Sequence, residues 1–149
     1  MRIAIAADHA GVDVKDDLKR FLATLGHQTE DLGPQSRESV DYPDFAHHLA
    51  REVVEGKADR GVLICGSGIG MSIAANKVPG ARAALVHDAY TARMARQHND
   101  ANILVLGARV LGPDLLKDCL HVFLNEDFTP GDDGRHLRRV QKLELHGER

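Results

Sequence analysis

The sequence predicts a three-layer αβα fold, in which helices cover both faces of a five-stranded parallel β-sheet and a further helix lies at the C-terminus. Apolar runs of strand length alternate with amphipathic segments of helix length from the first residue onward. Helices of this length between successive strands are typical of parallel sheets. The 149 residues suit one domain, residues 1–149, and the sequence contains no internal repeat, low-complexity tract or evident linker.

The first half of the chain contains three predicted strands and two predicted helices. Apolar residues recur three or four positions apart along the first helix, and a glycine follows both helices, where a chain often leaves the helical conformation. We expect a strand over residues 2–7, a helix over 11–25, a strand over 28–32, a glycine–proline loop over 33–41, a helix from about 43 to 55, and a strand over 61–65.

The second half continues the alternation. Small residues after the third strand indicate a short helix, and a proline stands at the first position of a later helix, where no N–H donor is needed. We expect a helix over residues 72–76, a strand over 81–86, a helix over 89–98, a strand over 102–106, a helix over 113–124, a polar loop over 128–135, and a terminal helix over 137–145.

Composition and charge exclude several classes of function. Hydrophobic residues make up 43% and charged residues 28% of the chain, and the net charge of −3 gives no reason to expect nucleic acid or an anionic membrane as partner. No apolar run approaches the length of a membrane span, and the first residues do not resemble a signal peptide. Of the two cysteines, Cys119 lies on the apolar face of a predicted helix, which indicates a reducing, cytoplasmic location rather than a disulfide.

The most informative segment is the end of the third strand, where Cys65 is followed by Gly66-Ser67-Gly68-Ile69-Gly70. The three glycines leave backbone N–H groups uncovered, and these groups and the helix start behind them favour negative charge. A thiol at this position should ionise more readily than a free thiol. We interpret the segment as a reacting centre. The alternative is a tight strand-to-helix turn with a buried structural cysteine.

Three familiar motifs fail at the same residue of this segment. A dinucleotide fingerprint requires a third glycine where Met71 stands. A phosphate loop requires a lysine before Ser72, and a cysteine phosphatase would need an arginine six residues after the cysteine to bind the phosphate oxygens. Both of these positions are again Met71, so the sequence excludes all three.

Further polar residues follow predicted strands and helices. Asp8 and His9 follow the first strand, Arg109 follows the fifth, and His98-Asn99-Asp100 ends the helix over 89–98. Because parallel sheets bind ligands at the carboxyl ends of their strands, we expect these groups to share one rim with Cys65. Each group alone could be a satisfied polar turn, but together they indicate an enzyme that acts on a small molecule.

The end of the chain carries a different signal. Arg135 and Arg139 are four residues apart and therefore share one face if a helix begins there, which suits a phosphate group. The alternative is a solvated basic helix end. The other histidines lack ligand spacing, and the adjacent His47 and His48 diverge on a predicted helix, so we expect no metal site.

Seven motifs cover essentially the whole chain. They are Ala7-Asp8-His9-Ala10-Gly11, Asp41-Tyr42-Pro43, Ile64-Cys65-Gly66-Ser67-Gly68-Ile69-Gly70, Asn76-Lys77, Arg96-Gln97-His98-Asn99-Asp100, Gly107-Ala108-Arg109-Val110, and Gly134-Arg135-His136 through Arg139-Val140. In this order the chain resembles type B ribose-5-phosphate isomerase, whose wider family includes isomerases of galactose 6-phosphate and allose 6-phosphate. The usual threonine two residues after the cysteine is Ser67 here, which keeps the hydroxyl group.

The resemblance implies a Rossmann-like fold and an aldose–ketose isomerase of the pentose phosphate pathway. Its reaction would interconvert ribose 5-phosphate and ribulose 5-phosphate through an enediolate, without a metal or an organic cofactor. The family is dimeric, with some tetrameric members, and residues of the neighbouring subunit complete each site. We therefore expect a homodimer or a tetramer whose small-molecule partner is a sugar phosphate.

The resemblance also implies roles for single residues. Cys65 would be the proton-transfer base, and Ser67 would donate its hydroxyl to an enediolate oxygen. His98 would open the sugar ring, and Asp8 would accept the proton of the anomeric hydroxyl. The remaining binding residues would be Tyr42 and Asn99 for sugar hydroxyls, Gly66, Ser67, Gly68, Ile69 and Gly70 for the enediolate, and His9, Arg109, Arg135 and Arg139 for the phosphate.

Two alternatives stay open at this point. Another phosphorylated sugar, such as a hexose 6-phosphate or a tetrulose phosphate, would use the same chemistry with a pocket of different length. A sugar-phosphate-binding regulator would keep the fold without turnover. The presence of both Cys65 and His98 argues against a regulator, because a sensor needs no proton-transfer base.

Overall fold

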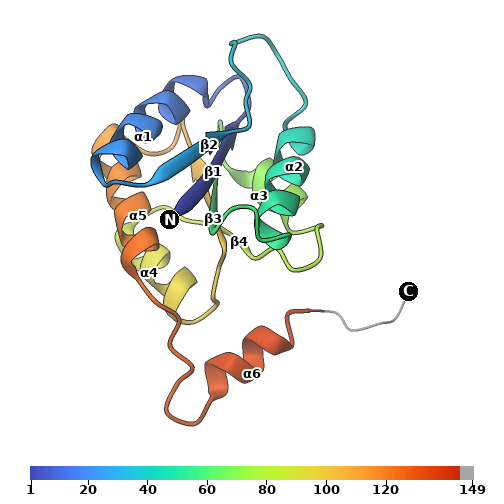
Figure 1. Cartoon of the computed structure of the whole chain (residues 1–149), viewed down its shortest axis with the longest axis vertical. Coiled ribbons are helices and arrows are strands. Elements are labelled where there is room, and N and C mark those ends of the chain that lie inside the picture. The colour runs from blue at the N-terminus through green and yellow to red at the C-terminus, as the bar shows by residue number, and fades with distance from the viewer. Residues whose placement is uncertain (145–149) are drawn as a thin grey trace.

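The computed structural model describes residues 1–144, and it confirms the predicted three-layer α/β arrangement (Figure 1). All strand pairs are parallel, and the five strands form one sheet in the order β2-β1-β3-β5-β4. In chain order the elements are β1 (Arg2–Ala7), α1 (Val12–Thr24), β2 (Gln28–Asp31), α2 (Tyr42–Val54), β3 (Arg60–Cys65), α3 (Ile69–Ala75), β4 (Ala83–Leu85), α4 (Ala89–Gln97), β5 (Ile103–Gly107), α5 (Pro113–Asn125) and α6 (Arg135–Gln141).

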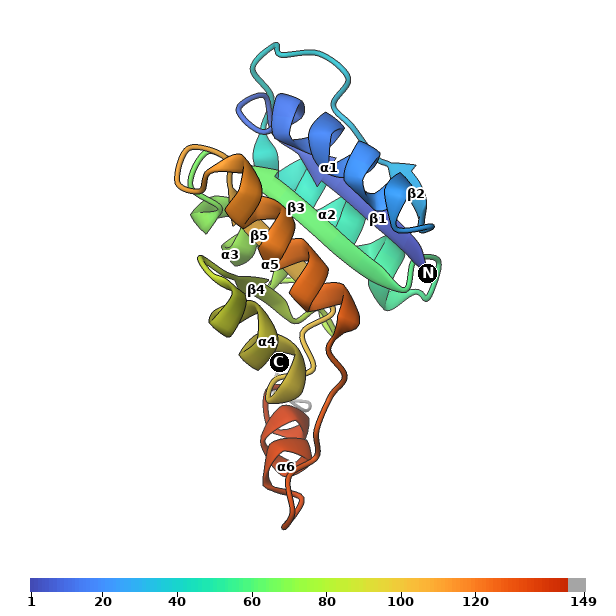
Figure 2. The ribbon, with the colours of Figure 1, turned by 90° about the vertical axis from the view of Figure 1, so that its left-hand side faces the viewer.

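Each face of the sheet is covered by its own set of helices. Alternate residues of a strand point to opposite faces, so neighbours such as Ile64 and Cys65 belong to different apolar clusters. Helices α1, α4 and α5 cover the face of Ile64, and α2 and α3 cover the face of Cys65 (Figure 2). Within residues 1–144, none of the helices is long and apolar enough to span a membrane.

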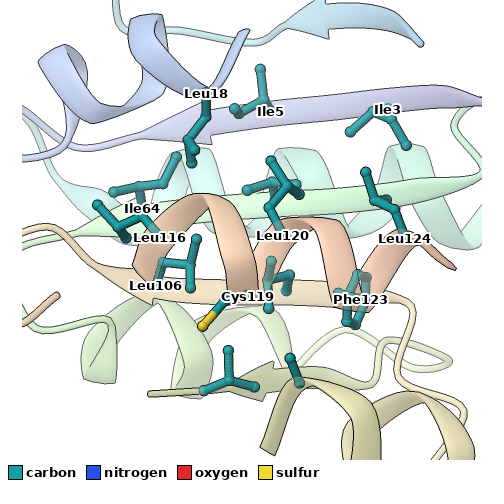
Figure 3. Close-up of a cluster of buried hydrophobic side chains, with 14 of the residues drawn as sticks. Ile3, Ile5, Leu18, Ile64, Leu106, Leu116, Cys119, Leu120, Phe123 and Leu124 are labelled. Atoms are coloured by element: carbon teal, nitrogen blue, oxygen red, sulfur yellow. The ribbon is translucent and has the colours of Figure 1, made fainter. Parts of the chain in front are cut away.

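Helix α5 rests on the sheet through one face, as its apolar spacing predicts. Leu116, Leu120 and Phe123 point from this helix toward the strands in Figure 3. Cys119 lies in the same cluster and is fully buried, at 0% exposure, which confirms the prediction that it is a core residue. Burial, together with the nearby Asp88, raises the pKa of the Cys119 thiol to about 11, because an ionised sulfur would lose its solvation there.

Helix α3 and strand β4 have boundaries that differ from the sequence prediction. Helix α3 begins at Ile69 rather than at residue 72, because Gly68 adopts a left-handed conformation (φ 81°) that turns the chain directly into the helix. Strand β4 is shorter than the predicted 81–86, because the N–H of Arg82 donates to the side chain of Asn102 (2.8 Å) and not to a neighbouring strand.

The terminal helix α6 lies beyond the end of the sheet, at the bottom of Figures 1 and 2. It begins two residues earlier than predicted, because Gly134 (φ 69°) turns the chain into the helix, and it ends at Gln141. The sequence predicts this helix over residues 137–145, and residue 145 lies outside the described residues. The loop before α6 is attached to the end of α4 by a hydrogen bond from the N–H of Thr129 to the carbonyl of Gln97 (2.9 Å).

Two glycines that precede helices give a test of the packing at the carboxyl edge of the sheet. A Cβ atom on Gly11 would lie 2.6 Å from the carbonyl oxygen of Ile64, whereas a Cβ on Gly112 would meet nothing within 4 Å. Both residues have negative φ angles, −102° and −71°. We therefore expect Gly11→Ala to destabilise the protein by about 1–3 kcal/mol through displaced backbone. Gly112→Ala should change stability by less than about 1 kcal/mol. Urea unfolding of both variants measures the difference, and equal effects would contradict it.

Candidate functional site

The thiol of Cys65 lies at the carboxyl end of β3, where the glycine loop folds back over it. The N–H of Gly68 donates to Sγ of Cys65 at 3.1 Å, and only 5% of the residue is exposed. A hydrogen bond donated to sulfur stabilises negative charge on it. The loop therefore supports a thiolate at the edge of the sheet.

Glycine is required at position 68 for two reasons. Its φ angle of 81° is one that residues with a side chain rarely adopt. A Cβ at this position would also lie 3.2 Å from the backbone of Leu106 and would overlap the side chain of Leu85. The N–H that reaches the thiol is therefore positioned by close contact between the glycine loop and strands β4 and β5.

Ser67, which lies between Gly66 and Gly68, directs its hydroxyl group into the loop. The hydroxyl oxygen of Ser67 accepts the N–H of Ile69 at 3.2 Å, which satisfies one of the free N–H groups at the start of α3. The next N–H of the helix, that of Gly70, has no acceptor within the helix, because the first turn offers none. It is therefore available to a ligand.

A cavity of about 600 Å³ opens next to the thiol. It collects residues from the ends of three strands and from the start of two helices. Eight of the predicted site residues are brought together here. The lining residues are Asp8, Tyr42, Cys65, Gly66, Ser67, Ile69, Gly70, Ile73, Arg109 and Val110.

The carboxylate of Asp8 is held in place by the turn that leads into α1. Its Oδ1 atom accepts the N–H groups of Ala10 (2.9 Å) and Gly11 (3.2 Å), and the residue is 8% exposed. Both bonds use one oxygen, so this turn leaves the second oxygen free to accept a proton or a hydroxyl group. The carboxylate thus has the position and the chemistry of a base.

Two glycines of the loop allow larger side chains to close the cavity. The guanidinium of Arg109 lies against Gly66, where an added Cβ would be 3.3 Å from Nη1. The ring of Tyr42 lies against Gly70, where an added Cβ would be 2.5 Å from Cζ. Because Gly66 and Gly70 have no side chains, the guanidinium of Arg109 and the phenol of Tyr42 can lie against the loop and line the same cavity as the thiol.

His9 is adjacent to this cavity but is not one of its lining residues. Its Nδ1 atom accepts the N–H of Val40 at 3.4 Å, which links it to the loop over residues 33–41. The base of that loop is held by the buried ammonium of Lys15, which donates to Asp31 (2.8 Å) and to the carbonyl of Pro34 (2.6 Å). Burial of Asp31 opposes ionisation, but the hydrogen bonds that its carboxylate accepts from Lys15, Lys19 and Gly33 outweigh burial and lower its pKa to about 2.

The predicted site residues at the end of α4, His98 and Asn99, lie at the opposite edge of the sheet. The carbonyl of Asn102, which follows these residues closely in the chain, accepts the N–H of Gly61 at the start of β3, whereas Cys65 is at the end of that strand. Four residues of a strand correspond to roughly 13 Å. The expectation that His98-Asn99-Asp100 shares a rim with Cys65 in the same chain is therefore wrong. A helix that follows a strand runs back across the sheet, so α4 ends at the amino-terminal edge (Figure 2).

His98 has a partner that the sequence analysis did not identify. Its ring stacks on that of His136, with 4.1 Å between centroids and 12° between planes. Burial, the neighbouring His98 and Arg135 all lower the pKa of His136, because each disfavours its charged form. Position 136 lies within the last motif of the sequence, but nothing in a single sequence relates its side chain to position 98.

Helix α6 carries Arg135 and Arg139, the two predicted phosphate-binding arginines, together with His136, which contacts His98. It begins at Arg135, so Arg135 and Arg139 are separated by one helical turn, as the prediction required. Asn99 lies nearby in the chain and lines a separate cavity of about 580 Å³ between α4 and the region of β4. Within residues 1–144, no group of three or more His, Cys, Asp and Glu side chains could hold a metal ion.

Comparison with known proteins identifies the family of the chain. The pattern of the ribose/galactose isomerase family matches residues 3–143. D-erythrulose-4-phosphate isomerase of Pectobacterium atrosepticum is 41% identical over 94% of this chain and 93% of its own length. Ribose-5-phosphate isomerase B of Escherichia coli is 40% identical over 95% and 93%.

The fold agrees as closely as the sequence. The structure of ribose-5-phosphate isomerase B from Clostridium thermocellum superimposes with a TM-score of 0.93 at 50% identity, covering 96% of this chain and 95% of that one. The match extends over both edges of the sheet and over the sequence motifs. The chain therefore belongs to the ribose/galactose isomerase family of sugar phosphate isomerases.

Proposed function

We propose that the protein interconverts ribose 5-phosphate and ribulose 5-phosphate. The main support is the thiol of Cys65, which accepts an N–H from its own glycine loop at 3.1 Å and shares a cavity with the carboxylate of Asp8. This combination suits proton transfer between neighbouring carbons of a small sugar. The similarity to ribose-5-phosphate isomerase B of Escherichia coli, at 40% identity, supports a pentose phosphate as substrate.

In the proposed mechanism, the thiolate of Cys65 removes the proton from C2 of the open aldose and returns it to C1, while the proton of the C2 hydroxyl moves to the oxygen on C1. The electrons of the broken C–H bond form the double bond of an enediolate, and negative charge develops on the carbonyl oxygen. The N–H of Gly70 and the hydroxyl of Ser67 are available to stabilise that charge, and each well-placed donor contributes about 3 kcal/mol to the transition state. No metal or organic cofactor is needed for these steps.

Ring opening and phosphate binding use residues from the Cys65 cavity together with residues from the ends of α4 and α6. His98 protonates the ring oxygen while Asp8 accepts the proton of the anomeric hydroxyl, and Asn99 and Tyr42 hold sugar hydroxyls. The phosphate is bound by arginine forks and by one histidine. On the Cys65 side these residues are His9 and Arg109, and on the α6 side they are Arg135 and Arg139.

Because the two groups lie at opposite edges of one chain, we infer a homodimer in which each site is shared. Exposed apolar side chains surround the mouth of the Cys65 cavity, with Ile69 and Ile73 each more than half exposed. Leu137 and Leu143, on and after α6, are also exposed. Apolar patches of this kind are typical of protein interfaces. The α6 end of one subunit would cover the Cys65 cavity of its partner and complete the catalytic set.

A four-carbon sugar phosphate is the second candidate substrate. The relative from Pectobacterium atrosepticum that acts on D-erythrulose 4-phosphate is 41% identical, against 40% for the Escherichia coli ribose-5-phosphate enzyme, so identity does not separate the two. Comparison of kcat/KM for four-, five- and six-carbon aldose phosphates tests the choice. The pentose proposal would be abandoned if erythrose 4-phosphate were the better substrate by tenfold or more.

Removal of the thiol should separate chemistry from binding. Cys65→Ala is expected to lower kcat by about 10²–10⁴-fold, the usual contribution of a positioned base. Binding of ribose 5-phosphate, measured by calorimetry, should change little, because the thiolate acts on a proton and makes few contacts with the bound substrate. Cys119→Ala is the matched control for loss of a thiol, and any loss of stability in it is measured by thermal unfolding. Retention of more than a tenth of the activity by Cys65→Ala would show that another residue is the base.

The two thiols should differ in reactivity. Cys65 borders a cavity, whereas Cys119 is fully buried and has a pKa raised to about 11. Thiolates are the species that alkylate, so iodoacetamide at pH 8 should label Cys65 and leave Cys119 unmodified. Mass spectrometry of the peptides identifies the modified residue, and ribose 5-phosphate should slow the labelling. Inactivation with label only on Cys119 would contradict the assignment.

Mixing of two inactive variants tests the shared site. Cys65→Ala lacks the base, and the double variant Arg135→Ala/Arg139→Ala lacks the phosphate forks, so each homodimer should be inactive. Random exchange of subunits makes half of the dimers mixed, and each mixed dimer contains one intact site, so activity should return to roughly a quarter of normal. Native mass spectrometry confirms the exchange. Mixed dimers without activity would mean that each site is built from one chain.

A further inference from the structure

The turn that follows His98 and Asn99 has an unusual backbone. Asp100 has a φ angle of 46°, and it is the one residue other than glycine with a positive φ among residues 1–144. Side chains disfavour this conformation, and such residues persist where the surrounding structure holds them. The turn also closes α4, because the N–H of Asp100 donates to Arg96 (3.1 Å) and that of Ala101 to Ala95 (2.9 Å).

Two arginines hold this residue from both sides. Oδ1 of Asp100 accepts Nη1 of Arg96 at 2.9 Å, and Oδ2 accepts Nη2 of Arg82 at 3.2 Å. Nε of Arg82 also donates to the carbonyl of Asp100 at 2.8 Å. The side chain and the peptide of a single residue are therefore fixed together, and rotation about the turn would break all three bonds.

The first of these arginines is itself rigidly placed. The side chain of Arg96 is 3% exposed, and its Nη1 donates to the carbonyl of Ala101 at 2.6 Å. Its Nε contacts the carbonyl of Glu126 (3.3 Å), and its guanidinium lies 5.8 Å from the ring centroid of Phe123. The carboxylate of Asp100 is thus anchored to α5 and to the start of the segment that leads to α6.

We propose that Asp100 is a positioning residue that fixes the left-handed turn after α4 and thereby the direction of His98 and Asn99 toward the sugar. The proposal rests on the function proposed above, in which His98 opens the sugar ring. Ring opening depends on the direction of one imidazole, and a displacement of about 1 Å can reduce such a step 10²-fold. The side chain of Asp100 is 35% exposed but that of Arg96 is only 3% exposed, so removal of the carboxylate also lowers stability, and the melting temperature of each variant is measured beside its activity.

Three variants separate the side chain from the backbone. Asp100→Gly keeps the left-handed conformation accessible and removes both ion pairs. Asp100→Asn also tolerates this conformation and removes the charge. Arg82→Gln leaves Asp100 in place and removes its more exposed partner. We expect kcat for ribose 5-phosphate to fall about 10- to 100-fold in both Asp100 variants, and less in Arg82→Gln. Asp59→Asn, which removes an ion pair with Arg2 at the same edge of the sheet, should leave kcat unchanged.

A double-mutant cycle with His98→Asn decides whether Asp100 acts through His98. If it does, Asp100→Asn/His98→Asn should be no slower than His98→Asn alone. Losses that multiply, or a wild-type rate in Asp100→Gly, would overturn the proposal. A merely structural role would lower the melting temperature without this dependence on His98. A His98→Asn variant with full activity would instead show that the proposed ring-opening role is wrong, so the two failures are distinguishable.

Discussion

In a parallel sheet each strand returns through a helix, so strand ends and helix ends lie at opposite edges of the molecule. This constraint divides the proposed functional residues of the protein into two groups. Cys65 and Asp8 follow strands, whereas His98 ends a helix, and β3 alone separates the two edges by its full length. If the proposed roles hold, a single chain contains two halves of a site, and the proposed dimer is the simplest arrangement that joins them.

The half that contains the thiol depends on the absence of side chains. Gly66 leaves room for the guanidinium of Arg109, Gly68 for the backbone of β5, and Gly70 for the ring of Tyr42. Each contact brings a different element to the thiol, and the left-handed Gly68 also directs its N–H to the sulfur. Three glycines in five residues are therefore a packing requirement as well as a source of free N–H groups.

The other half depends on charge and stacking rather than on small residues. His98 stacks on His136, and the turn that follows is held between Arg96 and Arg82 through the carboxylate of Asp100. These contacts join the end of α4 to the start of α6, so the histidine and the two arginines of α6 belong to one connected unit.

The sequence by itself determined the fold class, the family and the Cys65 loop, because these follow from local periodicity and from residues close together in the chain. It placed Asp8 and Arg109 near the thiol correctly. It could not place His98 on the right edge, since the direction of a helix is set by its packing on the sheet, nor relate His98 to His136. Only the tertiary structure decided how the two halves are separated, because that depends on contacts between residues distant in the chain.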